Sequence, residues 1–178
     1  MKVIFLDFDG VLNGYTKKTR TIFDVARKLH LIKFLYLIYD VFGIRFWKVF
    51  KLFCICKITG AKVVLSSSWK QAYYKPYKEC GSRGKELQRK MKFWKIPVIG
   101  ITEYCNGIRG KEIQLYLKNH PKIHNFIILD DESFDIKDYF PDNLILTSNG
   151  KVGTCYENSG LRLSHVIKAI QILNKKEV

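Results

Sequence analysis

Short apolar runs alternate with helical patterns along most of this chain. The runs have the length of strands and are apolar on both faces, as are strands buried inside a parallel sheet. They lie at Val3–Leu6, Lys62–Leu65, Pro97–Ile101, Phe126–Leu129 and Leu144–Leu146, and the helical patterns cover Gly84–Trp94, Lys111–Lys118 and Leu163–Leu173. This order predicts an α/β fold, a Rossmann-like parallel sheet with helices on both faces.

The stretch between the first two predicted strands departs from this alternation. Residues 29–58 are rich in Leu, Ile, Phe and Tyr, with helical spacing on either side of Gly43. Charges such as Lys33, Asp40 and Lys51 keep the apolar runs well short of the roughly 18 to 20 residues that a membrane-spanning helix needs. We therefore expect helices that pack on the core rather than on a membrane surface, and no transmembrane segment.

Length and composition narrow the class of protein. A chain of 178 residues with 47% hydrophobic content is long enough for one domain, which we expect to span 1–178. Its five cysteines are irregularly spaced and its N-terminus reads as a strand rather than a signal peptide, which indicates a reduced, cytoplasmic protein. The net charge of +15 favours nucleic acid, an anionic membrane or another polyanion as a partner, and most of the excess could equally be solvated surface. Nothing in the sequence indicates the oligomeric state.

Acidic and hydroxyl side chains follow three of the predicted strands. They are Asp7 and Asp9 after the first, Ser66, Ser67 and Ser68 after the second, and Asp130 and Asp131 after the fourth. The carboxyl ends of parallel strands meet at one edge of a sheet, so four carboxylates would share a small volume and repel one another. A divalent cation would relieve this repulsion, and ligation by oxygen alone favours Mg²⁺.

Two carboxylates one residue apart also suit phosphoryl transfer. One can attack phosphorus while the other donates a proton to the leaving group and then activates water. Gly10 lets the chain turn sharply after them. A hydroxyl group and a cation at the start of the helix near Arg109 and Lys111 could hold the remaining phosphate oxygens.

These motifs are similar to those of a known enzyme superfamily. DFDGVLN, LSSSWK, RGKEIQLYL and FIILDDES together resemble the four motifs of the haloacid dehalogenase (HAD) phosphohydrolases. With PVIGIT, LILT and the Gly-Leu before the last helix, the chain resembles the HAD domain of Swiss Army Knife RNA repair proteins over residues 1–13 and about 59–174. HAD enzymes carry cap modules between the first two motifs, so the resemblance implies that the insertion there, at about 14–59, is a small helical cap.

The resemblance implies a role for each acidic residue. It makes Asp7 the nucleophile and Asp9 the general acid/base. It assigns Mg²⁺ to the Asp7 side chain, the Asp9 carbonyl oxygen and the Asp130/Asp131 pair.

Two phosphate contacts stay open between neighbouring residues. For the hydroxyl group the motif favours Ser67, with Ser66 as the alternative one residue earlier. For the cation it favours Arg109, where many HAD enzymes have lysine, with Lys111 as the alternative.

The function expected from this resemblance is a Mg²⁺-dependent phosphomonoesterase that forms an aspartyl-phosphate, with RNA or DNA ends as the substrate. Tyrosines and cations interleave from Tyr73 to Lys90, a mixture that suits single-stranded nucleic acid and equally an ordinary basic helix with its loop. The alternatives are a phosphatase for a small metabolite and a non-catalytic module that binds nucleic acid or a membrane surface.

Overall fold

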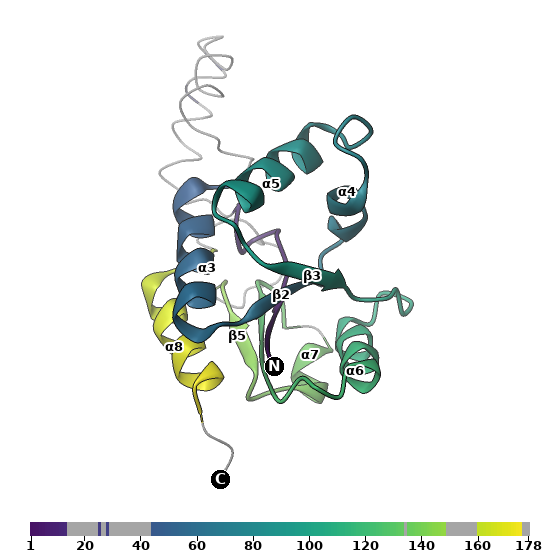
Figure 1. Cartoon of the computed structure of the whole chain (residues 1–178), viewed down its shortest axis with the longest axis vertical. Helices are drawn as coiled ribbons and strands as arrows, with labels where there is room; N and C mark the ends of the chain where they lie inside the picture. Colours follow the sequence, from purple (N-terminus) through teal and green to yellow (C-terminus); the bar gives the residue numbers. More distant parts are fainter. Residues whose placement is uncertain (14–24, 26–27, 29–43, 134, 149–159, 176–178) are drawn as a thin grey trace.

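The computed structural model describes residues 1–13, 25, 28, 44–133, 135–148 and 160–175. Its elements are β1 (Lys2–Leu6), α3 (Phe46–Thr59), β2 (Lys62–Leu65), α4 (Lys70–Tyr74), α5 (Ser82–Phe93), β3 (Val98–Ile101), α6 (Arg109–Asn119), β4 (Asn125–Asp130), α7 (Ile136–Tyr139), β5 (Leu144–Leu146) and α8 (Leu163–Leu173). Figure 1 shows their arrangement.

The strands form one parallel sheet in the order β3-β2-β1-β4-β5. The central strand β1 pairs with β2 on one side and with β4 on the other. From β1 the chain first forms β2 and β3 on one side, and then crosses to form β4 and β5 on the other side. In such sheets ligands bind at this switch point, beyond the carboxyl ends of the strands. The predicted Rossmann-like fold class is confirmed.

Alternate residues of β1 belong to two separate hydrophobic cores. Ile4 and Leu6 pack in the core that includes residues of α3, α5 and α8, whereas Val3 and Phe5 pack in the core that includes residues of α6 and α7. Both faces of the sheet are therefore covered by helices, as Figure 1 shows. This explains why β1 is apolar at every position from Val3 to Leu6 instead of alternating.

Helix α3 lies inside the range where a cap was predicted, about 14–59. Val49, Leu52 and Ile55 on this helix are buried in the core beside α8. This last part of the range thus covers the sheet, as the crossover between β1 and β2. Apart from residues 25 and 28, the range 14–43 lies outside the described residues, and a cap there stays a prediction.

Two short helices, α4 and α7, were not predicted, because four or five residues are too few to show a helical period. Helix α6 begins at Arg109, two residues before the predicted start. In the described part of the chain, no helix has both the length and the apolar character to cross a membrane.

Candidate active site

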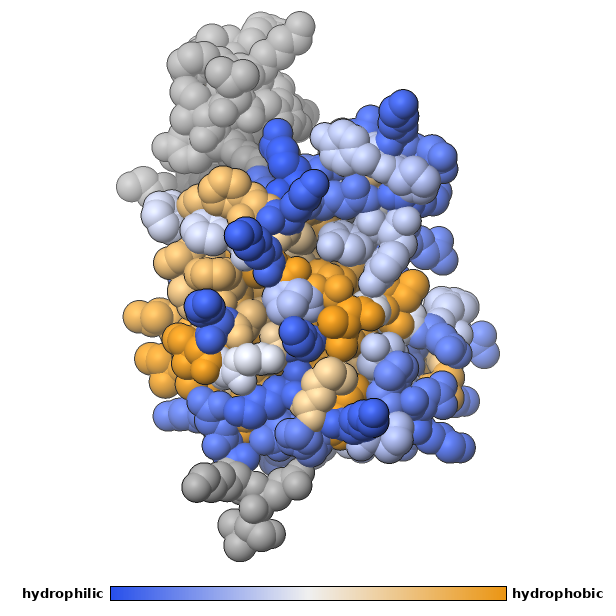
Figure 2. Space-filling view, in the orientation of Figure 1, coloured by the Kyte–Doolittle hydropathy of each residue, from blue (hydrophilic) through white to orange (hydrophobic). Residues whose placement is uncertain are grey.

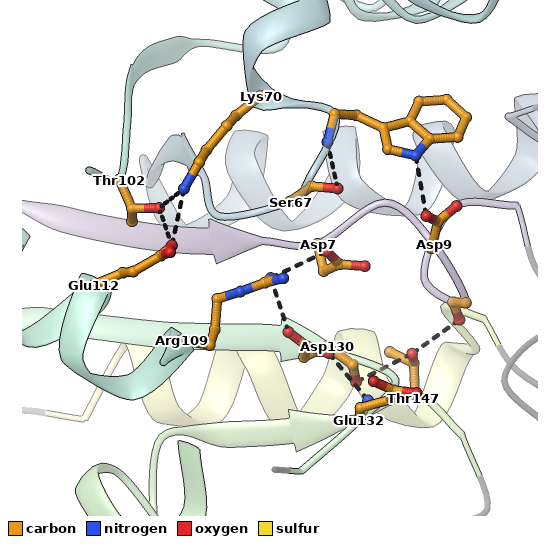
Figure 3. Close-up of polar contacts among 12 residues, drawn as sticks. Asp7, Asp9, Ser67, Lys70, Thr102, Arg109, Glu112, Asp130, Glu132 and Thr147 are labelled. Atoms are coloured by element: carbon orange, nitrogen blue, oxygen red, sulfur yellow. Dashed lines mark hydrogen bonds and ion pairs between the residues drawn. The ribbon is translucent and has the colours of Figure 1, made fainter. Parts of the chain in front are cut away.

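Most of the predicted site residues meet near the carboxyl ends of β1, β2 and β4, where Figure 3 shows Asp7, Ser67 and Asp130 together with Arg109. Asp7 directly follows β1, Ser66 directly follows β2, and Asp130 is the last residue of β4. The backbone N–H of Asp7 donates to the Leu129 carbonyl, and that of Ser66 donates to the Leu6 carbonyl. The sheet register thus extends one residue beyond the strands and holds these positions side by side.

Three buried carboxylates form the centre of the site. Asp7, Asp130 and Asp131 each offer an oxygen within 4.8 Å of the others, and they are 6%, 4% and 6% exposed. The Oδ2 atom of Asp131 is buried and accepts no hydrogen bond from any described residue. An orphaned carboxylate oxygen inside such a cluster leaves a ligand position open for a cation.

Burial and mutual repulsion raise the pKa values of these carboxyls. Burial and the charge of Asp7 raise the pKa of Asp131 to about 7. The same two causes raise the pKa of Asp130 well above its usual range. Burial also raises the pKa of Asp7, and the nearby Arg109 partly offsets this effect. Without a metal, the protein therefore holds protons in this cluster at pH values where free carboxyls have lost theirs.

Arg109 reaches into the cluster from the first residue of α6. Its Nη1 atom lies 3.1 Å from Asp7 Oδ1 and 3.3 Å from Asp130 Oδ2. The backbone N–H groups of Arg109 and Gly110 both donate to the Asp135 carboxylate, which caps the helix from a distant segment. Gly110 makes room for these contacts, because a Cβ there would lie 2.4 Å from the Tyr139 ring and 2.8 Å from Asp135 Oδ2, so that these side chains would have to shift.

Lys111, the alternative cation, is exposed on α6, and none of the contacts described within the site involves it. Of the two candidates, the structure brings Arg109 into contact with the predicted nucleophile.

Ser66 and Ser67 are both buried, and their environments differ. The Ser67 Oγ atom accepts the backbone N–H of Trp69 at 3.2 Å, so its own proton is left to donate. Hydrogen bonding with Ser67 is one of the weaker influences that lower the pKa of Asp7 against the effect of burial. The Ser66 Oγ atom has no partner among the described residues. Ser67 is thus the hydroxyl that interacts with Asp7.

The Asp9 carboxylate lies apart from the acidic cluster and is fixed by two donors. Trp69 Nε1 donates to its Oδ2 atom at 3.0 Å, and Asn13 Nδ2 donates to its Oδ1 atom at 2.7 Å. The Asn13 side chain also accepts the Gly10 N–H at 2.8 Å, which closes the turn after β1. Sequence reasoning missed both donors, although each stands within four residues of a motif residue.

Gly10 brings this turn against the cluster. It has φ = +60°, and a Cβ at this position would lie 1.9 Å from Asp131 Oδ2. Its carbonyl accepts the hydroxyl of Thr147 at 3.0 Å, and the Thr147 N–H donates to the Asp130 carbonyl at 2.8 Å. Thr147, a third residue that sequence reasoning missed, therefore connects the turn to the end of β4.

Comparison with known proteins agrees with the resemblance seen in the motifs. Residues 3–154 match the family model described as the HAD domain in Swiss Army Knife RNA repair proteins. The chain belongs to this family. No curated protein and no solved structure matches it in the same comparisons. The family match includes every residue of the candidate site.

The residues present fit the divalent cation that HAD domains generally use. Asp7, Asp130 and Asp131 supply hard oxygen ligands, and the orphaned Asp131 oxygen lies among them. The Asp9 carboxylate is engaged with Trp69 and Asn13, which leaves its backbone carbonyl as the group by which Asp9 is predicted to bind metal.

Proposed function

We propose that this HAD domain is a Mg²⁺-dependent phosphomonoesterase that forms an aspartyl-phosphate on Asp7. The observation that carries the proposal is the convergence on Asp7 of a guanidinium group, a hydroxyl group and two further buried carboxylates. A structural ion pair needs only one of these partners. A phosphoryl-transfer site needs them all, because charge on the nucleophile and on the phosphate oxygens must be balanced together.

In the first step, a carboxylate oxygen of Asp7 attacks phosphorus, and the bond between phosphorus and the leaving oxygen breaks. Asp9 donates its proton to that oxygen as it departs. In the second step, water gives a proton back to Asp9 and attacks phosphorus, so that the bond to Asp7 breaks and inorganic phosphate is released. The hydrogen bonds from Trp69 and Asn13 fix the direction of the Asp9 carboxyl group for both transfers.

Arg109 and Ser67 would hold the phosphate oxygens during both steps. Arg109 pairs with two carboxylates at its present position, and its planar donors suit phosphate equally well. Asp7, Asp130 and Asp131 would hold the Mg²⁺ ion, which when bound supplies Lewis-acid neutralisation of the phosphate charge.

Two observations favour a nucleic-acid end as the substrate. The family is described by its occurrence in RNA repair proteins. In addition, the segment that follows Ser67 exposes Tyr74, Lys75, Tyr77 and Lys78. The ammonium group of Lys85 lies 5.7 Å from the centre of the Tyr77 ring. Figure 2 shows a largely hydrophilic surface over α4 and α5, the helices that flank this segment. Exposed aromatic rings beside lysines suit bases and phosphates of a single strand.

The direct test is a screen of oligonucleotides with 3′- or 5′-phosphates and of small phosphorylated metabolites, each with Mg²⁺ and with EDTA. We expect Mg²⁺-dependent release of phosphate, with the oligonucleotides as the better substrates at low salt. Faster turnover of a metabolite would indicate the small-molecule phosphatase instead. Oligonucleotide binding without any turnover would indicate a non-catalytic module.

The nucleic-acid preference has its own test in Lys75 and Lys78. Replacing both with alanine should make the plot of log kcat/KM against log salt shallower for oligonucleotides by about 1.4, at about 0.7 per phosphate contact on a single strand. Turnover of p-nitrophenyl phosphate should not change. The matched control is the pair Lys118 and Lys122, two exposed lysines at and just beyond the other end of α6. An equal effect of both pairs would argue against a specific nucleic-acid surface.

A further inference from the structure

A buried ion pair lies beside the site without contacting any of the acidic residues described above. Lys70 Nζ lies 2.9 Å from Glu112 Oε2, and the two residues are 8% and 3% exposed. The Thr102 hydroxyl accepts from Lys70 Nζ at 3.1 Å and donates to Glu112 Oε2 at 3.0 Å. Glu112 Oε1 accepts the backbone N–H of Cys105 at 3.3 Å. Figure 3 shows the three side chains pointing toward one another.

The partners of this network come from the segments that carry the two proposed phosphate contacts. Lys70 begins α4, and its backbone N–H donates to the Ser67 carbonyl at 3.1 Å. Glu112 lies on α6, nearly one turn after Arg109. The ion pair therefore ties the segment of Ser67 to the helix of Arg109. Thr102, which directly follows β3, donates to the same carboxylate. Glu112 therefore joins the segments that follow β2 and β3 to helix α6.

Stability alone is a weak reason to bury such a pair. Taking two charges out of water costs free energy, and the attraction between the charges often does no more than offset this cost. Apolar residues of similar size in the same place often stabilise a protein at least equally well. Charge-assisted hydrogen bonds are short and directional, so what they add is a fixed distance between the groups that carry them. Ser67 and Arg109 must both fit one phosphate group, and a displacement of about 1 Å at such contacts can cost about a hundredfold in rate.

We propose that Lys70 and Glu112 are positioning residues that hold Ser67 and Arg109 at the spacing of a phosphoryl group. The proposal rests on the function proposed above and adds two residues to it. Neither residue is assigned a contact with substrate. Their effect passes through the backbone of α4 and α6.

Glu112→Gln is the informative single variant, because it keeps the size and one acceptor oxygen while removing the charge. With Mg²⁺ present, kcat for p-nitrophenyl phosphate should fall about tenfold or more, within the range that such misplacement costs. Affinity for inorganic phosphate, measured by calorimetry, should fall at least about fivefold for the same reason. Lys70→Met should behave similarly.

The double variant Lys70→Met/Glu112→Gln separates positioning from stability. It removes the ammonium group that the single Glu112 variant leaves buried without its counter-ion, so its Tm should return toward that of the wild type. Its kcat and phosphate affinity should stay low, because the fixed distance is not restored. Asn143→Ala is the matched control: the Asn143 amide donates to the Phe126 carbonyl at 2.8 Å, near the opposite edge of the sheet. This control should lower Tm and leave phosphate affinity and kcat unchanged.

Phosphate binding does not require turnover, so the two proposals can fail separately. If the wild type binds phosphate but turns over no substrate, the positioning proposal is decided by the phosphate affinities while the proposed function falls. If the wild type is active and both single variants keep kcat and phosphate affinity within about twofold at a temperature where they are folded, the positioning proposal is overturned and the function stands. Recovery of kcat together with Tm in the double variant would also overturn it, as would a wild type that does not bind phosphate.

Discussion

Replacing Gly10 with alanine should disable the proposed metal site through one methyl group. The new Cβ would lie 1.9 Å from Asp131 Oδ2, 2.1 Å from its Cγ and 2.4 Å from its Cβ, whereas ordinary contacts begin at about 3.4 Å. The whole Asp131 side chain must therefore retreat, and its Oδ2 atom by about 1.5 Å. Mg²⁺ binds its ligands at about 2.0–2.1 Å in a strict octahedral geometry and does not follow such a displacement. The variant should therefore lose Asp131 as a ligand.

Gly60→Ala is a matched control for the backbone strain. Gly10 and Gly60 have φ values of +60° and +71°, but a Cβ on Gly60 would meet nothing within 4 Å. An L-residue in this left-handed region costs about 1–2 kcal/mol. For a chain of this size, that cost lowers Tm by about 2–8 °C. Gly60→Ala should show this loss in EDTA, and Gly10→Ala should show a larger one, because its Cβ also overlaps the Asp131 side chain.

The assay is thermal unfolding with EDTA and with increasing Mg²⁺. At a hundredfold excess over Kd, a ligand of the native state adds about 2.7 kcal/mol, which corresponds to about 5–11 °C here. The wild type and Gly60→Ala should show this Mg²⁺-dependent increase, and Gly10→Ala should show less than half of it at the same concentration. An equal increase in the two alanine variants would refute the assignment of Asp131 to the metal.

Two further predictions concern the charges of the site. Because burial raises the folded-state pKa of Asp131 to about 7, the folded protein keeps a proton that the unfolded chain releases near pH 4. The metal-free protein should therefore lose stability as the pH rises from about 4 to about 7, and the control variant Asp131→Asn should lose less. Thermal unfolding in EDTA at a series of pH values measures both proteins. An equal fall of Tm with pH in the two would contradict the assignment of this effect to Asp131. Arg109→Ala should lower kcat/KM for p-nitrophenyl phosphate by about a hundredfold or more, as loss of a transition-state contact does. Lys111→Ala should change it by less than about twofold, and the reverse order would transfer the phosphate contact to Lys111.

The positions of the strands could be predicted because their signal is local. β2 and β5 have the predicted bounds, and the other three differ by one residue at one or both ends. A run that is apolar on both faces, together with its length, is sufficient to place a buried strand. The assignment to the HAD family of RNA repair proteins is confirmed by the family match. It could be predicted for the same reason as the strands, because the motifs are local and stand at the ends of these runs.

Packing of α3 on a core was expected, but whether the helix belongs to a cap or covers the sheet could not be predicted, because it gives no directional signal. It carries apolar residues around most of its circumference, including exposed Phe46 and Trp47 as well as buried Leu52 and Ile55. Such a pattern fits a cap that packs on a partner and equally a helix that packs on the sheet. Its contacts with α8, a helix more than a hundred residues later, decide between the two.

The arrangement within the site depends on partners distant in sequence. Arg109 lies at the site because α6 begins there, and that start is capped by Asp135, which the sequence does not mark. The pairing of Lys70 with Glu112 spans 42 residues, and that of Trp69 with Asp9 spans 60. Strand order predicts which segments meet, whereas only their packing determines which side chains touch.

The most direct measurement for the proposed chemistry is the detection of a phosphorylated Asp7. The protein is mixed with p-nitrophenyl phosphate and Mg²⁺, quenched with acid within a single turnover, and analysed by peptide mass spectrometry. Asp9→Asn should slow the second step and let the intermediate accumulate, because it removes the group that activates water. We predict one phosphoryl group on the peptide that contains Asp7, removable by hydroxylamine and absent from Asp7→Asn, which should also be inactive. Near-normal phosphatase activity in Asp7→Asn, or a phosphoryl group on another residue, would contradict the account.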